Sequence, residues 1–264
     1  MKYIEFIKKL DHKPNRQRFE LIIAWLDQHN IIYRRQEYAT GVNLVVDLGD
    51  GPQRIGISSH FDAVHGSGGA NDNASAIAVC LDMIERFTAG KANTPGLRIF
   101  FFDEEENGLK GSTAYTMQYG VADLLGLINM ELVGMGDKFA LWPVNQKYTG
   151  RLLRAFEQCA AQKNISATRF DKIITNTADH RSFRHVGLRD AFTITCISDK
   201  DIKAADLYYK ALQQGLPTAA LYDILGQAPV FKHYHRHTDT WDKLADNAMA
   251  MTAGAIWDTV QQVS

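Results

Sequence analysis

The stretch Leu97-Arg98-Ile99-Phe100-Phe101-Phe102 is a short, nearly continuous apolar run that leads directly into the acidic segment Asp103-Glu104-Glu105-Glu106. Apolar residues at successive positions over so short a run are typical of a strand that is covered on both faces. In open sheets of mostly parallel strands, the binding crevice lies beyond the carboxyl ends of the strands. The run therefore predicts a buried strand, and the acids after it become candidate functional residues.

Helical and strand-like segments alternate on both sides of this run. Apolar spacing predicts a helical N-terminal entry over about residues 1–30 and later helices at about 73–87, 112–119, 149–162 and 242–263. Further strands are expected at 42–48, 55–59, 126–133 and 191–197, and the turn Gly49-Asp50-Gly51-Pro52 indicates that the first two of them pair. This alternation predicts an α/β fold in a single domain over residues 1–264, with a mixed, mostly parallel central sheet and helices on both faces.

The charge balance excludes several classes of partner. The 29 Lys and Arg residues against 30 Asp and Glu residues give a formal net charge of -1, which offers no basic surface for nucleic acid and no polybasic anchor for a membrane. No apolar stretch approaches the ~20 residues of a membrane span. We therefore expect no nucleic acid and no membrane, but a small or neutral molecule as the partner. The composition leaves the oligomeric state open.

The N-terminal residues and the cysteines favour a cytoplasmic protein. The first nine residues mix charged and apolar side chains, and they lack the apolar region and the cleavage site of a signal peptide. The three cysteines, Cys80, Cys159 and Cys196, are widely separated and odd in number, which is typical of reduced thiols. We therefore expect a cytoplasmic location, although a secreted protein trimmed of its signal would have the same sequence.

Histidine and acidic residues follow several of the predicted strands. The strand at 55–59 leads into His60-Phe61-Asp62, where the histidine and the aspartate can act as a metal ligand and its orienting partner. Asp72 lies in the small-residue loop Gly69–Ser75, either to cap the helix that follows or to direct a carboxylate into the crevice. A histidine at a strand end is also often an ordinary polar residue. Neither motif is decisive alone.

The acidic segment and a histidine cluster strengthen the case for a cation site. The four adjacent carboxylates at 103–106 repel one another unless cations or solvent screen them, and a solvated acidic turn is the alternative. Glu131 adds a carboxylate directly after another strand-like run. Three of the nine histidines lie in His233-Tyr234-His235-Arg236-His237, and imidazole is a common zinc ligand. Together these segments predict a cation site assembled from distant parts of the chain.

These pieces carry a resemblance to a known family. The chain resembles the co-catalytic zinc exopeptidases related to bacterial leucyl aminopeptidase, aminopeptidase Y and the protease-like domain of the transferrin receptor. The matching pieces keep the family's order over about residues 55 to 244. They are Ser59-His60-Phe61-Asp62, Gly69-Ala70-Asn71-Asp72-Asn73-Ala74-Ser75, Glu105-Glu106-Asn107-Gly108-Leu109-Lys110-Gly111-Ser112, Asn129-Met130-Glu131, Asp179-His180-Arg181-Ser182-Phe183, and His235 with Asp239-Thr240. Each piece is weak by itself, while the ordered set is specific.

The resemblance implies the zinc-exopeptidase fold and two Zn²⁺ ions per chain. Asp72 would bridge the ions, with His60 on one of them and His235 on the other. Glu106 and Glu131 complete the implied set of metal ligands, and Glu131 stands where many members of the family have aspartate. The family places its histidine ligand four residues before an Asp-Thr pair, which selects His235 and leaves His237 as the fallback.

The same resemblance implies a hydrolytic mechanism. Glu105 would be the general base, and Asp62 would hold the His60 ring in the tautomer that presents its free nitrogen to metal. Asp179 and His180 match a segment that lines the site in relatives. The implied activity is that of a metallo-exopeptidase, an aminopeptidase acting on a peptide or small amide. Two alternatives stay open: a glutaminyl cyclase, which is a single-zinc acyltransferase that forms pyroglutamate, and a non-catalytic receptor-like domain.

Overall fold

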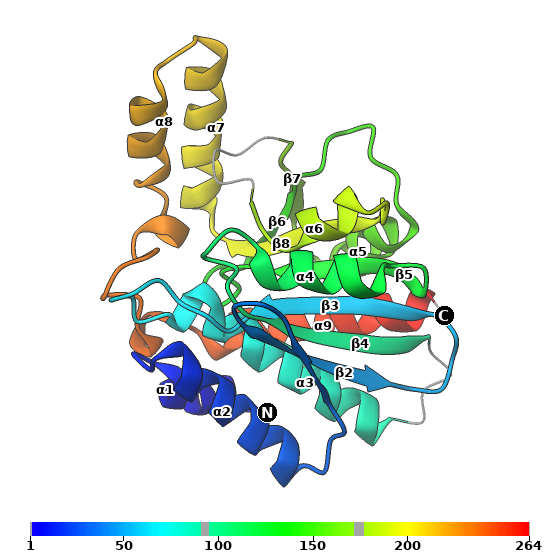
Figure 1. Cartoon of the computed structure of the whole chain (residues 1–264). Helices are drawn as coiled ribbons and strands as arrows, with labels where there is room; N and C mark the ends of the chain where they lie inside the picture. The colour runs from blue at the N-terminus through cyan, green and yellow to red at the C-terminus, as the bar shows by residue number, and fades with distance from the viewer. Residues whose placement is uncertain (1, 91–94, 172–176, 264) are drawn as a thin grey trace.

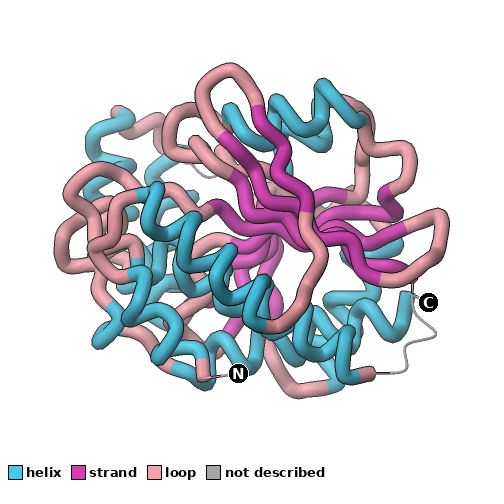
Figure 2. The backbone as a smooth tube through the Cα atoms, turned by 60° about the horizontal axis from the view of Figure 1, so that its bottom comes forward, coloured by secondary structure: helices cyan, strands magenta, loops and turns pink. Residues whose placement is uncertain are grey.

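A mixed sheet forms the centre of the computed structural model, which describes residues 2–90, 95–171 and 177–263. Its eight strands in the described residues are β1 (Arg34–Glu37), β2 (Val42–Leu48), β3 (Arg54–His60), β4 (Gly96–Phe102), β5 (Leu124–Met130), β6 (Lys138–Trp142), β7 (Ala167–Arg169) and β8 (Ala191–Ile197). They lie in the order β1-β2-β4-β3-β5-β8-β6-β7, and Figure 2 shows the sheet twisting between layers of helices. The central run β4-β3-β5-β8 is parallel throughout.

Helices cover both faces of this sheet, which confirms the predicted fold class (Figure 1). One face packs against α1 (Tyr3–Leu10), α2 (Asn15–Gln28), α3 (Ser75–Ala89), α5 (Arg151–Gln162) and α9 (Asp246–Val263), which together bury the larger core. The other face packs against α4 (Lys110–Tyr119) and α6 (His180–His185) over a smaller core. A hairpin of α7 (Asp199–Gln213) and α8 (Thr218–Leu225) projects from the body.

The apolar run that leads into the acidic segment forms β4, and every residue of this strand is buried. Ile99 and Phe101 join the larger core, while Phe100 and Phe102 join the smaller core on the opposite face. Successive side chains of a strand point to opposite faces, so a strand covered on both sides needs apolar residues at each position. The prediction of a strand buried on both faces is therefore confirmed.

The predicted pairing of the strands at 42–48 and 55–59 is wrong. Both strands exist as β2 and β3, but β4 lies between them, antiparallel to β2 and parallel to β3. The turn after β2 reverses the chain as expected, yet it leaves a gap one strand wide. Because β4 is apolar on both faces, it gains more from an interior place in the sheet than from an edge. The later strand thus enters between the two earlier ones.

Several element boundaries differ from the predictions, and some elements were not predicted at all. The third helix begins at Ser75, after a π-helical turn at Ala70–Ala74, and β5 ends at Met130 because Leu132 adopts a left-handed backbone with φ of 56°. The unpredicted elements are β1, β6, β7, α6, α7 and α8. In the part of the chain that the structure describes, no helix has the length and apolar character needed to cross a membrane.

The parallel strands bring the candidate residues to one edge of the sheet. His60 is the last residue of β3, Glu131 directly follows β5, and the acidic segment directly follows β4. These three strands are parallel neighbours, so their carboxyl ends lie side by side. This is the edge at which open α/β sheets bind ligands.

The smaller core holds α4 and α6 in place, and its aromatic rings offer a test of the fold. Phe100 packs edge-on against Tyr115 of α4 and Phe183 of α6, at centroid distances of 4.8 and 5.4 Å. We expect Phe100→Ala to lower the free energy of unfolding by about 3–5 kcal/mol, because it leaves a cavity beneath both helices. Chemical denaturation measures this change. The matched control Met117→Ala, at a side chain that is 71% exposed on α4, should stay within about 0.5 kcal/mol of the native protein.

Candidate metal centre

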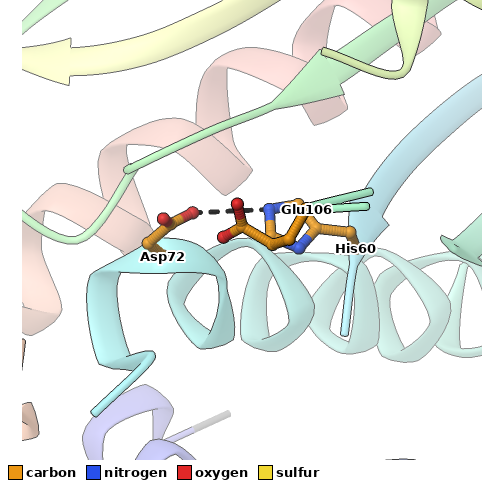
Figure 3. A group of neighbouring side chains, drawn as sticks. All are labelled: His60, Asp72 and Glu106. Carbon is orange, nitrogen blue, oxygen red and sulfur yellow. Dashed lines mark ion pairs between the residues drawn. The ribbon is translucent and has the colours of Figure 1, made fainter. Parts of the chain in front are cut away.

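Three side chains from distant parts of the chain converge at the carboxyl edge of the sheet (Figure 3). His60 comes from the end of β3, Asp72 from the turn before α3, and Glu106 from the loop after β4. Each offers one ligand atom, and these atoms all lie within 4.8 Å of one another. An imidazole nitrogen and two carboxylate oxygens at such separations form a donor set that suits a divalent cation.

Asp72 lies between two histidines and faces each with a different oxygen. Its Oδ1 is 3.4 Å from Nε2 of His60, and its Oδ2 is 3.4 Å from Nε2 of His235. On the first side, Glu131 Oε2 lies 3.2 Å from the same His60 nitrogen. On the second side, Glu106 Oε2 lies 3.1 Å from the same His235 nitrogen. The structure therefore groups the five predicted metal ligands into two half-sites that share Asp72.

The turn that carries Asp72 is fixed from behind by Asp239. The carboxylate of Asp239 accepts the backbone N–H groups of Asn71 at 2.8 Å and Asp72 at 3.0 Å. Helix capping by Asp72 or Asn73 was the alternative for this loop, but neither side chain caps the helix. The Asp72 carboxylate is instead free to face the two histidines, while its backbone is held by another acid.

Asp62 performs the equivalent task for the acidic segment. Its carboxylate accepts the backbone N–H of Glu105 at 3.1 Å and that of Glu106 at 3.0 Å. The His60 ring turns its Nδ1 toward Asp62, 3.0 Å from the carbonyl oxygen and 3.3 Å from Oδ1. A partner at Nδ1 leaves Nε2 as the nitrogen that faces Asp72 and Glu131. Asp62 thus positions a histidine and two glutamates at once.

Two asparagines orient Glu131. Asn129 donates to Glu131 Oε1 at 3.0 Å, and Asn73 donates to Oε2 at 2.7 Å. Asn73 also donates to the carbonyl oxygen of Met130 at 2.8 Å, so the turn before α3 is tied to the end of β5. Glutamate is one methylene longer than the aspartate common in the resembled family. These hydrogen bonds fix the longer side chain with Oε2 toward His60.

The protonation equilibria reflect a crowded set of buried charges. Burial favours the neutral His235 imidazole, but Asp72 and Glu106 outweigh this effect and raise its pKa to about 9. Burial, reinforced by the charge of Asp72, raises the pKa of Glu106 to about 7. For Asp72 itself, hydrogen bonds from His235 and His60 overcome burial and hold the pKa below its usual value. Each shift shows that these groups need opposite charge beside them.

The acids outnumber the basic groups in this region. Seven carboxylates lie in or directly behind the site, whereas the bases among the described residues there are His60, His235 and Arg18. The seven acids are Asp62, Asp72, Glu105, Glu106, Glu131, Asp179 and Asp239. Oε1 of Glu106 and both carboxylate oxygens of Asp179 are buried without a hydrogen-bond partner in the described residues. Uncompensated buried charge is costly, so the residues fit a site that takes up cations.

Glu105 faces a cavity that opens beside the two half-sites. Burial raises the pKa of this glutamate well above its usual value, and the charges of Glu131, Asp179 and Glu106 add to the shift. The walls beyond the polar edge are mainly apolar and include Trp142, Phe170, Leu225, Val230, Phe231 and Tyr234. An apolar cavity with a few polar groups at one end is typical of a small-molecule site.

The structure distinguishes between the other candidates named from the sequence. His237 is exposed and makes no ion pair with the acids of the site in the described residues, whereas His235 does. Asp179 is buried behind the site, and burial raises its pKa to about 8. His180 is buried beneath Trp142, with its Nδ1 at 2.6 Å from Thr193 Oγ1. It supports the cavity wall.

Sequence reasoning missed Arg18, which belongs to α2 and is completely buried. Its Nε donates to the carbonyl oxygen of Phe61 at 2.6 Å, and its Nη1 donates to that of Gly69 at 3.1 Å. The positive charge lies near Asp62, Asp72 and Asp239. A signal was present: Arg18, Ile22 and Leu26 recur every fourth residue, which sets the arginine on the apolar face of its helix.

Comparisons with known proteins place the chain in a family. A model described as Peptidase family M28 matches residues 43–260. A curated relative, endoplasmic reticulum metallopeptidase 1 of Mus musculus, is 31% identical over 162 residues, which is 57% of this chain but only 18% of the relative's length. That relative is named for the endoplasmic reticulum, and the cytoplasmic location expected for this chain stays a prediction.

Solved structures show the same fold at low sequence identity. A zinc aminopeptidase from Bacillus subtilis has a TM-score of 0.63 at 16% identity, over 84% of this chain and 50% of that one. A glutaminyl cyclase from Porphyromonas gingivalis has a TM-score of 0.72 at 18% identity, over 99% of this chain and 95% of that one. The fold is thus common to proteins of both activities, and the family model, which covers most of the sequence, shows that the chain belongs to Peptidase family M28.

Proposed function

We propose that this chain is a zinc-dependent aminopeptidase that binds two Zn²⁺ ions and removes the N-terminal residue of a peptide or small amide. The observation that carries the proposal is the position of Asp72, with one carboxylate oxygen toward each of two histidines. A single cation needs only one such half-site. A carboxylate shared by two half-sites is the arrangement expected for a pair of ions.

The donor set supports zinc as the metal. Each half-site combines one imidazole with carboxylates: His60, Asp72 and Glu131 in one, and His235, Asp72 and Glu106 in the other. Zinc favours imidazole and carboxylate ligands, whereas calcium and magnesium favour sites made of oxygen alone. Membership of Peptidase family M28 and the fold shared with a zinc aminopeptidase agree with this assignment.

The roles of the chain's own residues follow from their positions. Bound zinc supplies a Lewis acid that lowers the pKa of water toward ~7 and polarises the scissile carbonyl. Glu105, at the junction of the half-sites and the cavity, takes the proton of the attacking water and delivers it to the leaving amine nitrogen. Asp62 fixes the positions of the Glu105 backbone and the His60 ring for that transfer. The cavity binds the side chain of the N-terminal residue.

A glutaminyl cyclase is the second candidate, because the Porphyromonas gingivalis cyclase matches nearly the full length of both chains. That activity uses one zinc ion, and it needs the side chain of an N-terminal glutamine at the metal. A non-catalytic receptor-like domain fits less well, since such a domain has no need to keep all five ligands together with Glu105 beside an open cavity. The number of ions and the product formed distinguish the three possibilities.

The role of Glu105 is tested by Glu105→Gln, which removes the proton acceptor but keeps the size of the side chain. We expect kcat on aminoacyl p-nitroanilides to fall by roughly 10²–10⁴-fold, with zinc content unchanged. The matched control is Glu104→Gln, one residue earlier, where the native side chain pairs with Lys110 and Thr40 away from the half-sites. Activity of the Glu105 variant equal to that of the native protein, with metal bound, would remove the base assignment.

The metal assignment is tested by measuring zinc per chain together with activity. We expect the native protein to bind two ions and His235→Ala to lose about one of them, because Asp72 and Glu106 alone hold an ion weakly. His237→Ala serves as the control and should keep both ions, since that side chain is exposed outside the half-sites. A native stoichiometry of one ion, with pyroglutamate formed from glutaminyl peptides and no release of free amino acids, would favour the cyclase instead.

A further inference from the structure

A second cleft adjoins the apolar cavity at Glu105. The two spaces share Glu105, Thr177 and Tyr234, and the second one also reaches Glu106 and His235. It runs between α4 and α6, which lie side by side over the same face of the sheet (Figure 1). Ser182 of α6 fixes this spacing through its hydroxyl, 2.9 Å from Ser112 Oγ and 3.0 Å from Thr113 Oγ1.

The walls of this cleft carry more polar groups than those of the cavity. Thr113 and Thr116 line it from α4, while Arg181 and His185, four residues apart, line it from the same face of α6. The cleft thus combines hydroxyl groups, an imidazole and a guanidinium beside the metal half-sites.

Arg181 differs from the other arginines near the site because its guanidinium has no partner among the described residues. The side chain is exposed and makes no ion pair or hydrogen bond with any residue in the ranges 2–90, 95–171 and 177–263. Arg184 of the same helix, by comparison, donates to the carbonyl oxygen of Pro143 and stacks on Tyr148. Arg18 behind the site donates to two carbonyl oxygens. Arg181 therefore keeps its planar set of donors available to a molecule in the cleft.

We propose that Arg181 binds a carboxylate on the leaving-group side of the substrate, so that this protein acts on peptides with a negative charge directly after the scissile bond. The inference rests on the aminopeptidase function proposed above. If the side chain of the N-terminal residue fills the apolar cavity, the scissile bond lies at Glu105. The rest of the substrate then leaves through the cleft, where a guanidinium can bind a carboxylate through two parallel hydrogen bonds.

Two sources supply such a carboxylate, and both offer the same chemistry. One is the free C-terminus of a dipeptide, and the other is an acidic side chain on the second residue of a longer peptide. Three substrates separate them: Leu-Gly carries the terminal carboxylate, Leu-Glu-amide carries only the side-chain carboxylate, and Leu-Gly-amide carries neither. All three keep the same N-terminal residue for the cavity.

The experiment measures kcat and KM for these substrates with the zinc-loaded native protein, Arg181→Gln and Arg181→Lys. We expect Arg181→Gln to lower kcat/KM by about tenfold or more for a carboxylate substrate, mainly through KM, and to change Leu-Gly-amide less than twofold. Arg181→Lys should recover part of the loss, since it keeps the charge but not the paired donors. The control Arg189→Gln removes an exposed arginine outside both spaces and should leave all three substrates unchanged.

The outcomes separate this inference from the function on which it rests. A loss confined to Leu-Gly assigns the dipeptide terminus, and a loss confined to Leu-Glu-amide assigns the acidic side chain. Equal effects on charged and uncharged substrates, or no effect at all, would overturn the carboxylate site while leaving the aminopeptidase in place. If the native protein releases leucine from none of the three substrates or from aminoacyl p-nitroanilides, both proposals fail together.

Discussion

The repulsion between carboxylates at the carboxyl edge of the sheet is the constraint around which this molecule is organised. Asp72, Glu106 and Glu131 approach two histidines closely, and Glu105 lies among them in a region largely closed to solvent. Charges this near each other and this poorly hydrated are stable only with positive charge between them. Taking up cations therefore relieves a strain that the fold itself creates, and folding and metal binding are coupled in such a site.

The loops of the site keep their positions despite this repulsion because two further acids accept hydrogen bonds from backbone N–H groups and do not face the metal half-sites. Asp62 follows one histidine ligand by two residues and accepts the N–H groups of the loop that carries Glu105 and Glu106. Asp239 follows the other histidine by four residues and accepts the N–H groups of the turn that carries Asp72. Each segment that carries a histidine ligand therefore also holds, through its aspartate, a loop that carries carboxylate residues of the site. The permanent positive charge of Arg18 lowers the free-energy cost of burying Asp62 and Asp239.

The sequence predicted which candidate residues lie together more completely than it predicted the order of the strands, and the reason is physical. His60, Glu106 and Glu131 follow directly on apolar runs, so the rule that parallel strands end at one edge is enough to bring them together. The order of β2, β4 and β3 could not be predicted, because a turn signal reports only that the chain reverses and not what later enters the gap.

Other features were not predicted from the sequence because they are stabilised by contacts between residues far apart in the chain. The hairpin of α7 and α8 buries only a small cluster around Tyr208 and Leu221, while other apolar side chains such as Leu207 and Tyr222 are exposed, which leaves a weak periodic signal. Strand β7 has only three residues and depends on pairing with β6. The Arg181 cleft exists only because α6 packs beside α4, a contact between segments about seventy residues apart. Such properties follow from tertiary packing and not from composition or period.

The two spaces beside Glu105 also bear on which reaction the site supports. A glutaminyl cyclase has its electrophilic carbonyl in the side chain of the N-terminal residue, so that side chain lies at the metal and not in a separate pocket. An aminopeptidase places the backbone carbonyl at the metal, and the side chain then needs its own space. The cavity lined by Trp142, Phe170 and Phe231 offers such a space to an apolar group. The apolar cavity and the more polar cleft, which meet at Glu105, therefore suit the proposed aminopeptidase substrate, with a different residue recognised in each space.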